Sequence, residues 1–129
     1  MRKAANQRRI KQNPHQGIDI PRSTKGACSE LVAASDLLLK GYEVFRACSP
    51  CSCCDLIALK DGEQIQVEVK TGHYTSAGKL SYPQPRHLYG YDLLAIVVFD
   101  PNIEIIYQTH ENASEEIRYQ VKAWNKKEA

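Results

Sequence analysis

The dipeptide Asp61-Gly62 constrains this chain more than any other feature, because it separates two segments of strand-like composition. Asp-Gly is among the strongest sequence signals for a two-residue β-turn. The flanking segments therefore predict a hairpin with strands at about 55–60 and 63–71. Since a two-residue turn fixes the register, this hairpin also predicts which side chains face each other across the two strands.

The predicted register places Asp55 directly opposite Glu68. Opposed residues project from the same side of a hairpin, and like charges there are destabilising. Side chains alternate along a strand, so Lys70 lies on the same side as Glu68. The hairpin thus predicts a cluster of two carboxylates and one ammonium group.

A divalent cation is the simplest ligand that would offset the repulsion between two facing carboxylates and turn them into a binding site. Mg²⁺ (or Mn²⁺) binds one or two carboxylates together with waters and phosphate oxygens. Such a cation would activate a water for attack on a phosphodiester, while Lys70 would neutralise the developing charge. In the alternative interpretation, Asp55 is a polar residue near a turn and Glu68 and Lys70 form an exposed surface pair.

A helix from about residue 23 to 40 precedes the hairpin, with Ser23 or Thr24 as its N-cap and Gly41 as its left-handed C-cap. Apolar spacing predicts its core-facing stripe as Ala27, Leu31, Ala34 and Leu38. Glu30 lies on or beside this stripe. We therefore expect it to face a polar or cationic group, or to reach water at the edge of the helix.

The remaining elements complete an α/β fold. The sequence predicts strands at about 42–48, 93–99 and 104–108, a loop with at most a helical turn after Thr71, and a final helix capped by Asn112 with Ile117, Val121 and Trp124 as its apolar stripe. This gives a single domain over 23–129 with a mixed central sheet flanked by helices, in the order α-β-β-β-β-β-α.

Charge is distributed unevenly along the chain. Residues 1–25 carry seven Lys or Arg and one acidic residue, a net +6, which leaves the other 104 residues at −4 within the total of +2. We interpret residues 1–22 as a flexible basic arm that binds phosphate backbones, or else as a solvated tail. The predicted DNA contacts are Arg8, Arg9, Lys25, Lys79 and Arg86.

No apolar run is long enough to cross a bilayer, and the N-terminus lacks a secretory signal pattern, so we expect a cytoplasmic protein that does not enter membranes. In that reducing compartment the five cysteines are thiols or metal ligands rather than disulfides. A cluster of four could supply thiolates for a structural zinc ion, or these thiols could simply pack as small apolar groups. Its members are Cys48, Cys51, Cys53 and Cys54.

These motifs resemble the PD-(D/E)XK nuclease superfamily: Glu30 on a first helix, Asp55 opening a strand, and Glu68-Val69-Lys70 about a dozen residues later. The flanking sequences are similar to archaeal-type Holliday junction resolvases and to group I intron-associated endonucleases. The resemblance covers about residues 24–100. The residue before Asp55 is Cys54, where the motif has Pro.

The resemblance implies a restriction-endonuclease-like fold and a metal-dependent endonuclease that hydrolyses DNA, either at junctions or at specific sites. It implies Asp55, Glu68 and the Val69 carbonyl as metal ligands, Lys70 as catalytic and Glu30 as an accessory acid. We expect a homodimer or higher homo-oligomer, because two cuts need two centres. The alternative is a non-catalytic DNA-binding or zinc-organised module that keeps the same fold.

Overall fold

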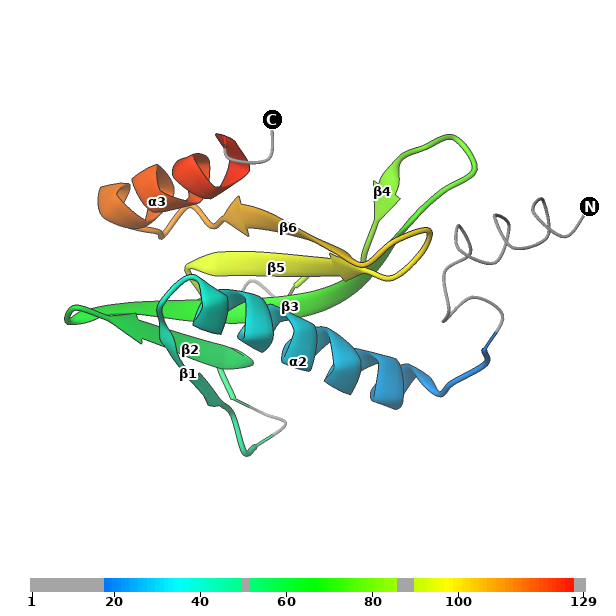
Figure 1. The fold of residues 1–129 in the computed structure, drawn as a ribbon, viewed down its shortest axis with the longest axis horizontal. Coiled ribbons are helices and arrows are strands. Elements are labelled where there is room, and N and C mark those ends of the chain that lie inside the picture. The colour runs from blue at the N-terminus through cyan, green and yellow to red at the C-terminus, as the bar shows by residue number, and fades with distance from the viewer. Residues whose placement is uncertain (1–17, 50–51, 86–89, 127–129) are drawn as a thin grey trace, which may run out of the picture.

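The computed structural model describes residues 18–49, 52–85 and 90–126, which form two helices and six strands (Figure 1). The elements are α2 (Arg22–Leu39), β1 (Glu43–Arg46), β2 (Leu56–Lys60), β3 (Glu63–Tyr74), β4 (Leu80–Ser81), β5 (Leu93–Val98), β6 (Glu104–Thr109) and α3 (Glu115–Lys126). Among these residues no helix is long and apolar enough to span a membrane. The predicted contacts Arg8, Arg9 and Arg86 and the thiol of Cys51 lie outside the described residues.

The strands form one mixed sheet in the order β1-β2-β3-β5-β6, and β4 pairs only with the end of β3. β3 and β5 are parallel, whereas the other neighbours are antiparallel. α2 crosses one face of the sheet and α3 packs beside β6 (Figure 1). This confirms the predicted α/β class with a mixed sheet flanked by helices. The predicted order lacked one strand, because the segment after Thr71 was expected to be a loop and instead contains β4.

The hairpin between β2 and β3 has the predicted geometry. Asp61 and Gly62 have φ values of 51° and 80°, so both turn residues have the positive φ that a two-residue hairpin of this type requires. Pairing runs from Lys60 opposite Glu63 to Leu56 opposite Val67. The predicted register is therefore confirmed.

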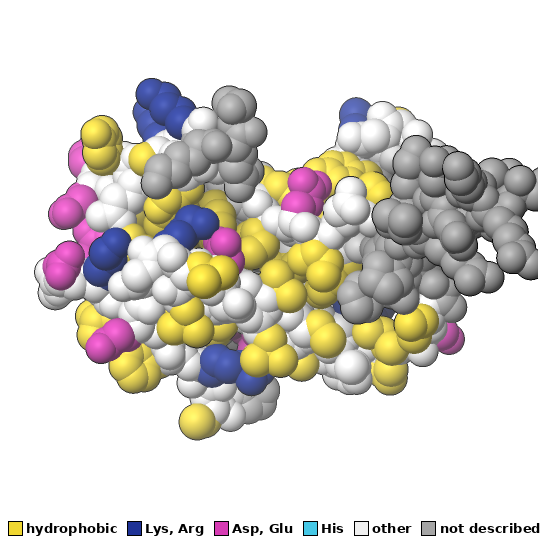
Figure 2. Space-filling model, viewed as in Figure 1, with side chains coloured by type: hydrophobic (Ala, Val, Ile, Leu, Met, Phe, Trp, Pro, Cys, Tyr) yellow, Lys and Arg dark blue, Asp and Glu magenta, His cyan; other side chains and the backbone are white. Residues whose placement is uncertain are grey.

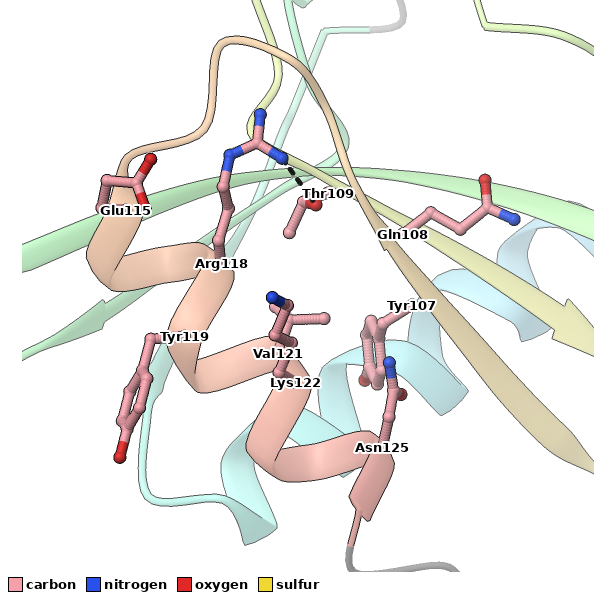
Figure 3. Close-up of a pocket in the computed structure, with 9 residues that line it drawn as sticks. All are labelled: Tyr107, Gln108, Thr109, Glu115, Arg118, Tyr119, Val121, Lys122 and Asn125. Carbon is pink, nitrogen blue, oxygen red and sulfur yellow. Dashed lines mark hydrogen bonds between the residues drawn. The ribbon is translucent and has the colours of Figure 1, made fainter.

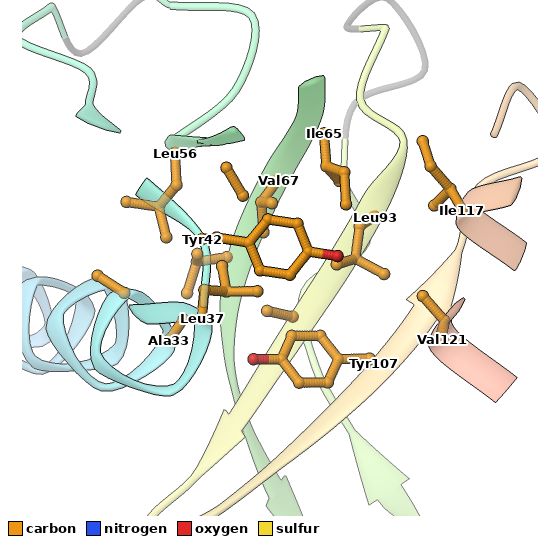
Figure 4. Packing of buried hydrophobic residues seen from close by; sticks show 14 of the residues in the cluster. Ala33, Leu37, Tyr42, Leu56, Ile65, Val67, Leu93, Tyr107, Ile117 and Val121 are labelled. Carbon is orange, nitrogen blue, oxygen red and sulfur yellow. The ribbon is translucent and has the colours of Figure 1, made fainter. Parts of the chain in front are cut away.

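The main core lies between the sheet and the two helices (Figure 4). From β3 it takes Ile65, Val67 and Val69, which project toward α2 from alternate positions. We call this side of the sheet the helix face. The other side, which carries the even-numbered residues of β3 and β5, is the open face.

The predicted core stripe of α2 was wrong in three of four positions. The buried residues are Ser29, Ala33, Ala34 and Leu37. Leu31 and Leu38 are instead 55% and 56% exposed. The helix carries two apolar stripes, and the one built from smaller side chains lies against the sheet. An alanine-rich face allows the helix axis to approach the strands closely.

Both helix starts differ from the prediction. α2 begins at Arg22, with Pro21 in an extended conformation at the N-cap, so neither Ser23 nor Thr24 caps it. Proline has a fixed φ and no N–H, which suits the residue before a first turn. At the other end of α2 the prediction is confirmed: Gly41 has φ +93°, and its N–H donates to the Leu38 carbonyl at 2.9 Å.

α3 begins at Glu115, and its cap is Ser114 rather than Asn112, because Ser114 Oγ accepts the Ile117 N–H at 3.2 Å. The predicted apolar stripe of α3 is confirmed: Ile117 and Val121 are buried. Trp124 packs with its ring centre 5.2 Å from that of Tyr107. β5 is buried along its whole length. These apolar groups thus belong to the core and are not free for assembly.

Candidate active site

Asp55 occupies the point where the ladder between β2 and β3 ends. Pairing stops at Leu56 opposite Val67, and the Asp55 N–H donates to the Val67 carbonyl at 3.0 Å. The side chain then folds along β3, where Oδ2 accepts the Val69 N–H at 2.7 Å. The Asp55 carboxylate therefore accepts a hydrogen bond from β3 that the backbone of one more β2 residue would otherwise accept. This bond fixes the carboxylate against the backbone of β3.

Glu68 projects from the open face of β3 beside Asp55, as the register predicts. It is only 8% exposed, although it is an acidic residue. Burial, followed by hydrogen bonding to Asp55 and the charge of that carboxylate, raises the pKa of Glu68 from 4.5 to about 8. The fold thus holds the two carboxyl groups together, and this destabilises the ionised form of Glu68 relative to its protonated form.

Lys70 completes the cluster. Its Nζ lies 3.8 Å from Glu68 Oε2, and its charge acts against the rise in the pKa of Glu68. About a quarter of the side chain is exposed, so the ammonium group can reach a ligand. The structure thus brings Asp55, Glu68 and Lys70 together, and the surface-pair alternative does not describe the buried Glu68.

The donor set suits a hard divalent cation. Two carboxylates lie side by side, and burial together with the neighbouring Asp55 raises the pKa of Glu68 even though Lys70 lies close by. A strand residue directs its N–H and C=O to the same edge of the strand, so the Val69 carbonyl points to the edge of β3 on which its N–H meets Asp55. In the part of the chain that the structure describes, no three His, Cys, Asp or Glu side chains form a metal-binding group. Two carboxylates and a carbonyl leave room for waters, which Mg²⁺ retains.

Glu30 lies at the margin of this cluster rather than inside it. α2 packs on the helix face, whereas Glu68 and Lys70 project from the open face. Glu30 forms an ion pair with Arg46 of β1, with Oε1 3.2 Å from the guanidinium. Its charge is nevertheless close enough to raise the pKa of Glu68. The expectation of a cationic neighbour for Glu30 is confirmed, and that neighbour is Arg46.

A groove of about 760 Å³ runs from Lys70 to the first turn of α2. Ser29 Oγ and Thr71 Oγ1 lie 2.6 Å apart and join α2 to β3 at its floor. Its lining includes the three cationic residues Arg22, Lys25 and Lys70, and also His73. Glu30 is the one acidic residue among the described residues that line it. The groove is therefore suited to a polyanion.

Sequence reasoning identified only part of this groove. Lys25 lies in it as one of the predicted DNA contacts, whereas Lys79 is exposed at the turn between β3 and β4. Arg22 was not predicted as a site residue. Arg22 is one helical turn from Lys25, and that spacing was the available signal. Tyr82 comes from the segment that was expected to be a loop.

The cysteines add one buried thiol next to the cluster. Burial raises the pKa of Cys54 to about 12, and its sulfur lies 3.9 Å from that of Cys53. Cys54 is 5% exposed and thus faces the interior. Cys48 and Cys53 are exposed.

A second cavity, of about 490 Å³, lies between β6 and α3 (Figure 3). Arg118 lines this cavity and donates hydrogen bonds to the His110 and Glu111 carbonyls at 3.0 Å each. These bonds stabilise the start of α3. Glu115 is its one acidic residue among those described. This cavity lacks a carboxylate pair and its arginine is engaged, so it is not the candidate site.

No protein-family model and no curated protein matches the sequence. Among solved structures, the fold is similar to that of a bacterial homing endonuclease, I-Ssp6803I, with a TM-score of 0.56. The match covers 84% of this chain and 99% of the other, at 15% sequence identity. The two chains therefore share a fold, and the predicted nuclease-like α/β architecture is confirmed.

Proposed function

We propose that this protein is a Mg²⁺- or Mn²⁺-dependent endonuclease of the PD-(D/E)XK type that hydrolyses phosphodiester bonds in DNA. The observation that carries the proposal is the pair formed by Asp55 and the buried Glu68, with Lys70 beside it. Lys70 of this cluster also lines a groove whose charged side chains are three cations, Arg22, Lys25 and Lys70, and one acid, Glu30. A pair of carboxylates alone would serve many purposes. A pair that adjoins a groove for a polyanion favours phosphate chemistry.

Each residue then has a distinct task. Asp55, Glu68 and the Val69 carbonyl would hold the cation, which would supply an activated water and polarise the phosphate. Lys70 stabilises the charge that develops on the phosphate oxygens as water attacks. Glu30 is an accessory acid that acts through water, because Arg46 holds its carboxylate at the margin.

DNA is the proposed partner, bound in the cytoplasm at a specific site or a junction. Arg22 and Lys25 approach phosphates that flank the scissile one, while the N-terminal arm with Arg8 and Arg9 adds contacts that do not depend on sequence. The neighbour I-Ssp6803I is a homing endonuclease by name, and this favours a specific duplex site over a junction. Arg86 would contact the flanking backbone.

We further propose that the protein acts as a homodimer or higher homo-oligomer, because each centre cuts one strand. The outer stripe of α2 leaves apolar side chains exposed, and Figure 2 shows hydrophobic groups gathered on this side of the molecule. Leu31, Leu38 and Leu39 are 55%, 56% and 85% exposed. α2 also carries Glu30, so a second copy on this stripe would hold the two centres in a fixed relation.

The test is cleavage of supercoiled plasmid and branched DNA with Mg²⁺, Mn²⁺ or EDTA. The variants are Asp55→Asn and Lys70→Met, with Glu115→Gln and Lys122→Ala as controls that remove the same charges from the exposed surface of α3. Loss of a metal ligand or charge-stabilising lysine should lower the cleavage rate at least about 100-fold. The controls should cleave as wild type does. Equal cleavage by Asp55→Asn and wild type would reject the site.

A non-catalytic DNA-binding module is the alternative, and zinc held by Cys48, Cys51, Cys53 and Cys54 would favour it. Metal analysis of the purified protein addresses that point directly. One zinc ion per chain that is lost in Cys53→Ser, together with no cleavage in any metal, would support the alternative. A zinc-free protein that cleaves DNA with Mg²⁺ would reject it.

A further inference from the structure

Beyond Gly72, the last residue of β3 that pairs with β5, the strand leaves the body of the sheet. It continues to Tyr74, turns, and returns as β4, with His73 opposite Ser81 and Tyr74 opposite Leu80. Residues 73–81 therefore form a two-stranded projection, which we call the β3–β4 ribbon (Figure 1). None of the proposed catalytic residues lies on this ribbon.

The tip of the ribbon is an ordered turn. The Thr75 N–H donates to the Lys79 carbonyl at 2.8 Å, and the Gly78 N–H donates to the Thr75 carbonyl at 2.8 Å. Thr75 Oγ1 also accepts the Lys79 N–H at 3.2 Å. Gly78 has φ +81°, a conformation that glycine adopts without strain. The tip thus presents its side chains in a defined arrangement.

The base of the ribbon is fixed to the sheet on the open face. Leu80 and Tyr82 pack against the buried cluster that contains Leu94 and Ile96. Tyr74 donates a hydrogen bond from its hydroxyl to Glu104 of β6. These contacts hold the ribbon in a constant position relative to Glu68 and Lys70, which lie on the same strand.

The surface of the ribbon is polar and free of acidic residues. Residues 73–79 are all exposed, and the segment 73–81 contains one lysine, one histidine and several hydroxyl groups but no Asp or Glu. Hydroxyl, ammonium and imidazole groups bond to base edges as well as to phosphates. An acid-free surface can approach a polyanion without repulsion. The composition therefore suits contact with bases.

We propose that the β3–β4 ribbon enters the major groove of duplex DNA and reads base edges there. This inference rests on the proposed function and names its substrate as duplex DNA with a preferred sequence. The major groove is about 12 Å wide and admits a two-stranded ribbon, whose strands lie about 4.8 Å apart. Ser76 and Lys79 are the reading residues, since Thr75 and Gly78 build the turn.

The ribbon also sets the distance between the cut and the bases that it reads. Ser76 follows Lys70 by six residues, and the chain is extended only as far as Tyr74, so the two residues lie at most about 20 Å apart at about 3.3 Å per residue. Successive base pairs rise about 3.4 Å, so the bases that are read lie within about six base pairs of the scissile phosphate.

The experiment selects sequences by binding and not by cleavage. Full-length protein is incubated, with Ca²⁺ in place of Mg²⁺, with duplexes whose central segment is randomised, and the bound duplexes are sequenced. The variants are Ser76→Ala and Lys79→Ala, with Lys122→Ala on α3 as the matched control that removes one exposed lysine. Thermal unfolding of each variant checks that it folds. A parallel reaction in Mg²⁺ maps the cut within the selected sequence.

Wild type should enrich a defined sequence, and each ribbon variant should lose about tenfold of the discrimination at one or two positions within about six base pairs of the cut. The control should keep the full preference. If no duplex is cut but the ribbon variants still alter the preferred sequence, the nuclease proposal fails and the ribbon proposal stands. Enrichment of no sequence by wild type would overturn the ribbon proposal. So would ribbon variants that bind every duplex more weakly by the same factor and keep the wild-type preference.

Discussion

Replacing Glu68 with Gln should stabilise the metal-free protein at high pH while it abolishes cleavage. The folded chain binds the Glu68 proton up to a pKa of about 8, whereas the unfolded chain releases it near the ordinary value of 4.5. Between these two values unfolding releases a proton, so the free energy of unfolding of the wild type falls as the pH rises. A glutamine does not titrate, and the variant therefore loses no stability from this position.

One pKa unit corresponds to about 1.4 kcal/mol, so the full shift sets an upper bound of about 5 kcal/mol. The actual destabilisation is smaller than this bound, because water enters the site when Glu68 becomes charged and because Lys70 neutralises part of that charge. We therefore expect Glu68→Gln to exceed the wild type by about 1–3 kcal/mol at about pH 9, and to match it below about pH 4.5.

The assay is urea unfolding in EDTA at several pH values, followed by the fluorescence of Trp124, the one tryptophan of the chain. Groups remote from Glu68 titrate equally in both proteins, so the difference between the two curves reports Glu68 and the groups whose pKa its charge raises, Cys54 and Tyr91. Mg²⁺ added at 100 times its dissociation constant should raise the free energy of unfolding of the wild type by about 2.7 kcal/mol. It should leave the free energy of unfolding of Glu68→Gln nearly unchanged. A stability difference that is the same at every pH would refute the reasoning.

Three further perturbations follow from the packing. Gly72→Ala should lower the free energy of unfolding by about 1–3 kcal/mol in urea titrations, because the new Cβ would lie 2.7 Å from Ile96 Cγ2 and 3.2 Å from the Ser81 carbonyl oxygen. A wild-type unfolding midpoint would contradict this contact. Tyr107→Phe removes a 2.6 Å hydrogen bond to Asp36 Oδ2 and should cost about 1–2 kcal/mol in the same assay. Leu39→Gln should lower the mass measured by light scattering toward that of a monomer without lowering thermal stability, since this side chain is 85% exposed; an unchanged oligomer would exclude the outer stripe of α2 as the interface.

The groove shows what one sequence could not reveal. Lys25 was predicted as a DNA contact from its charge alone, but its position beside Lys70 depends on how α2 crosses the sheet. That crossing follows from the burial of the alanine-rich stripe instead of the stripe with Leu31 and Leu38. Both stripes have helical spacing, so periodicity could not choose between them. The choice depends on the shape of the strands that the helix covers.

Glu30 gives the same lesson in electrostatic terms. Its place near an apolar stripe predicted a charged or polar neighbour, since an unpaired buried carboxylate is costly. The identity of that neighbour, Arg46 of β1, required two segments sixteen residues apart to meet. The position of Glu30 at the margin of the Asp55–Glu68 pair was likewise absent from the local pattern.

By itself, the sequence determined the hairpin at Asp61-Gly62, its register, and the juxtaposition of Asp55 with Glu68 and Lys70. These follow from turn chemistry and from the two-residue period of a strand, which act over a few neighbouring residues. Only the tertiary structure decided which stripe of α2 is buried, what surrounds the carboxylate pair, and that the chain after Thr71 forms a ribbon. Those outcomes depend on contacts between distant segments, where the packing of whole elements outweighs the preference of any single residue.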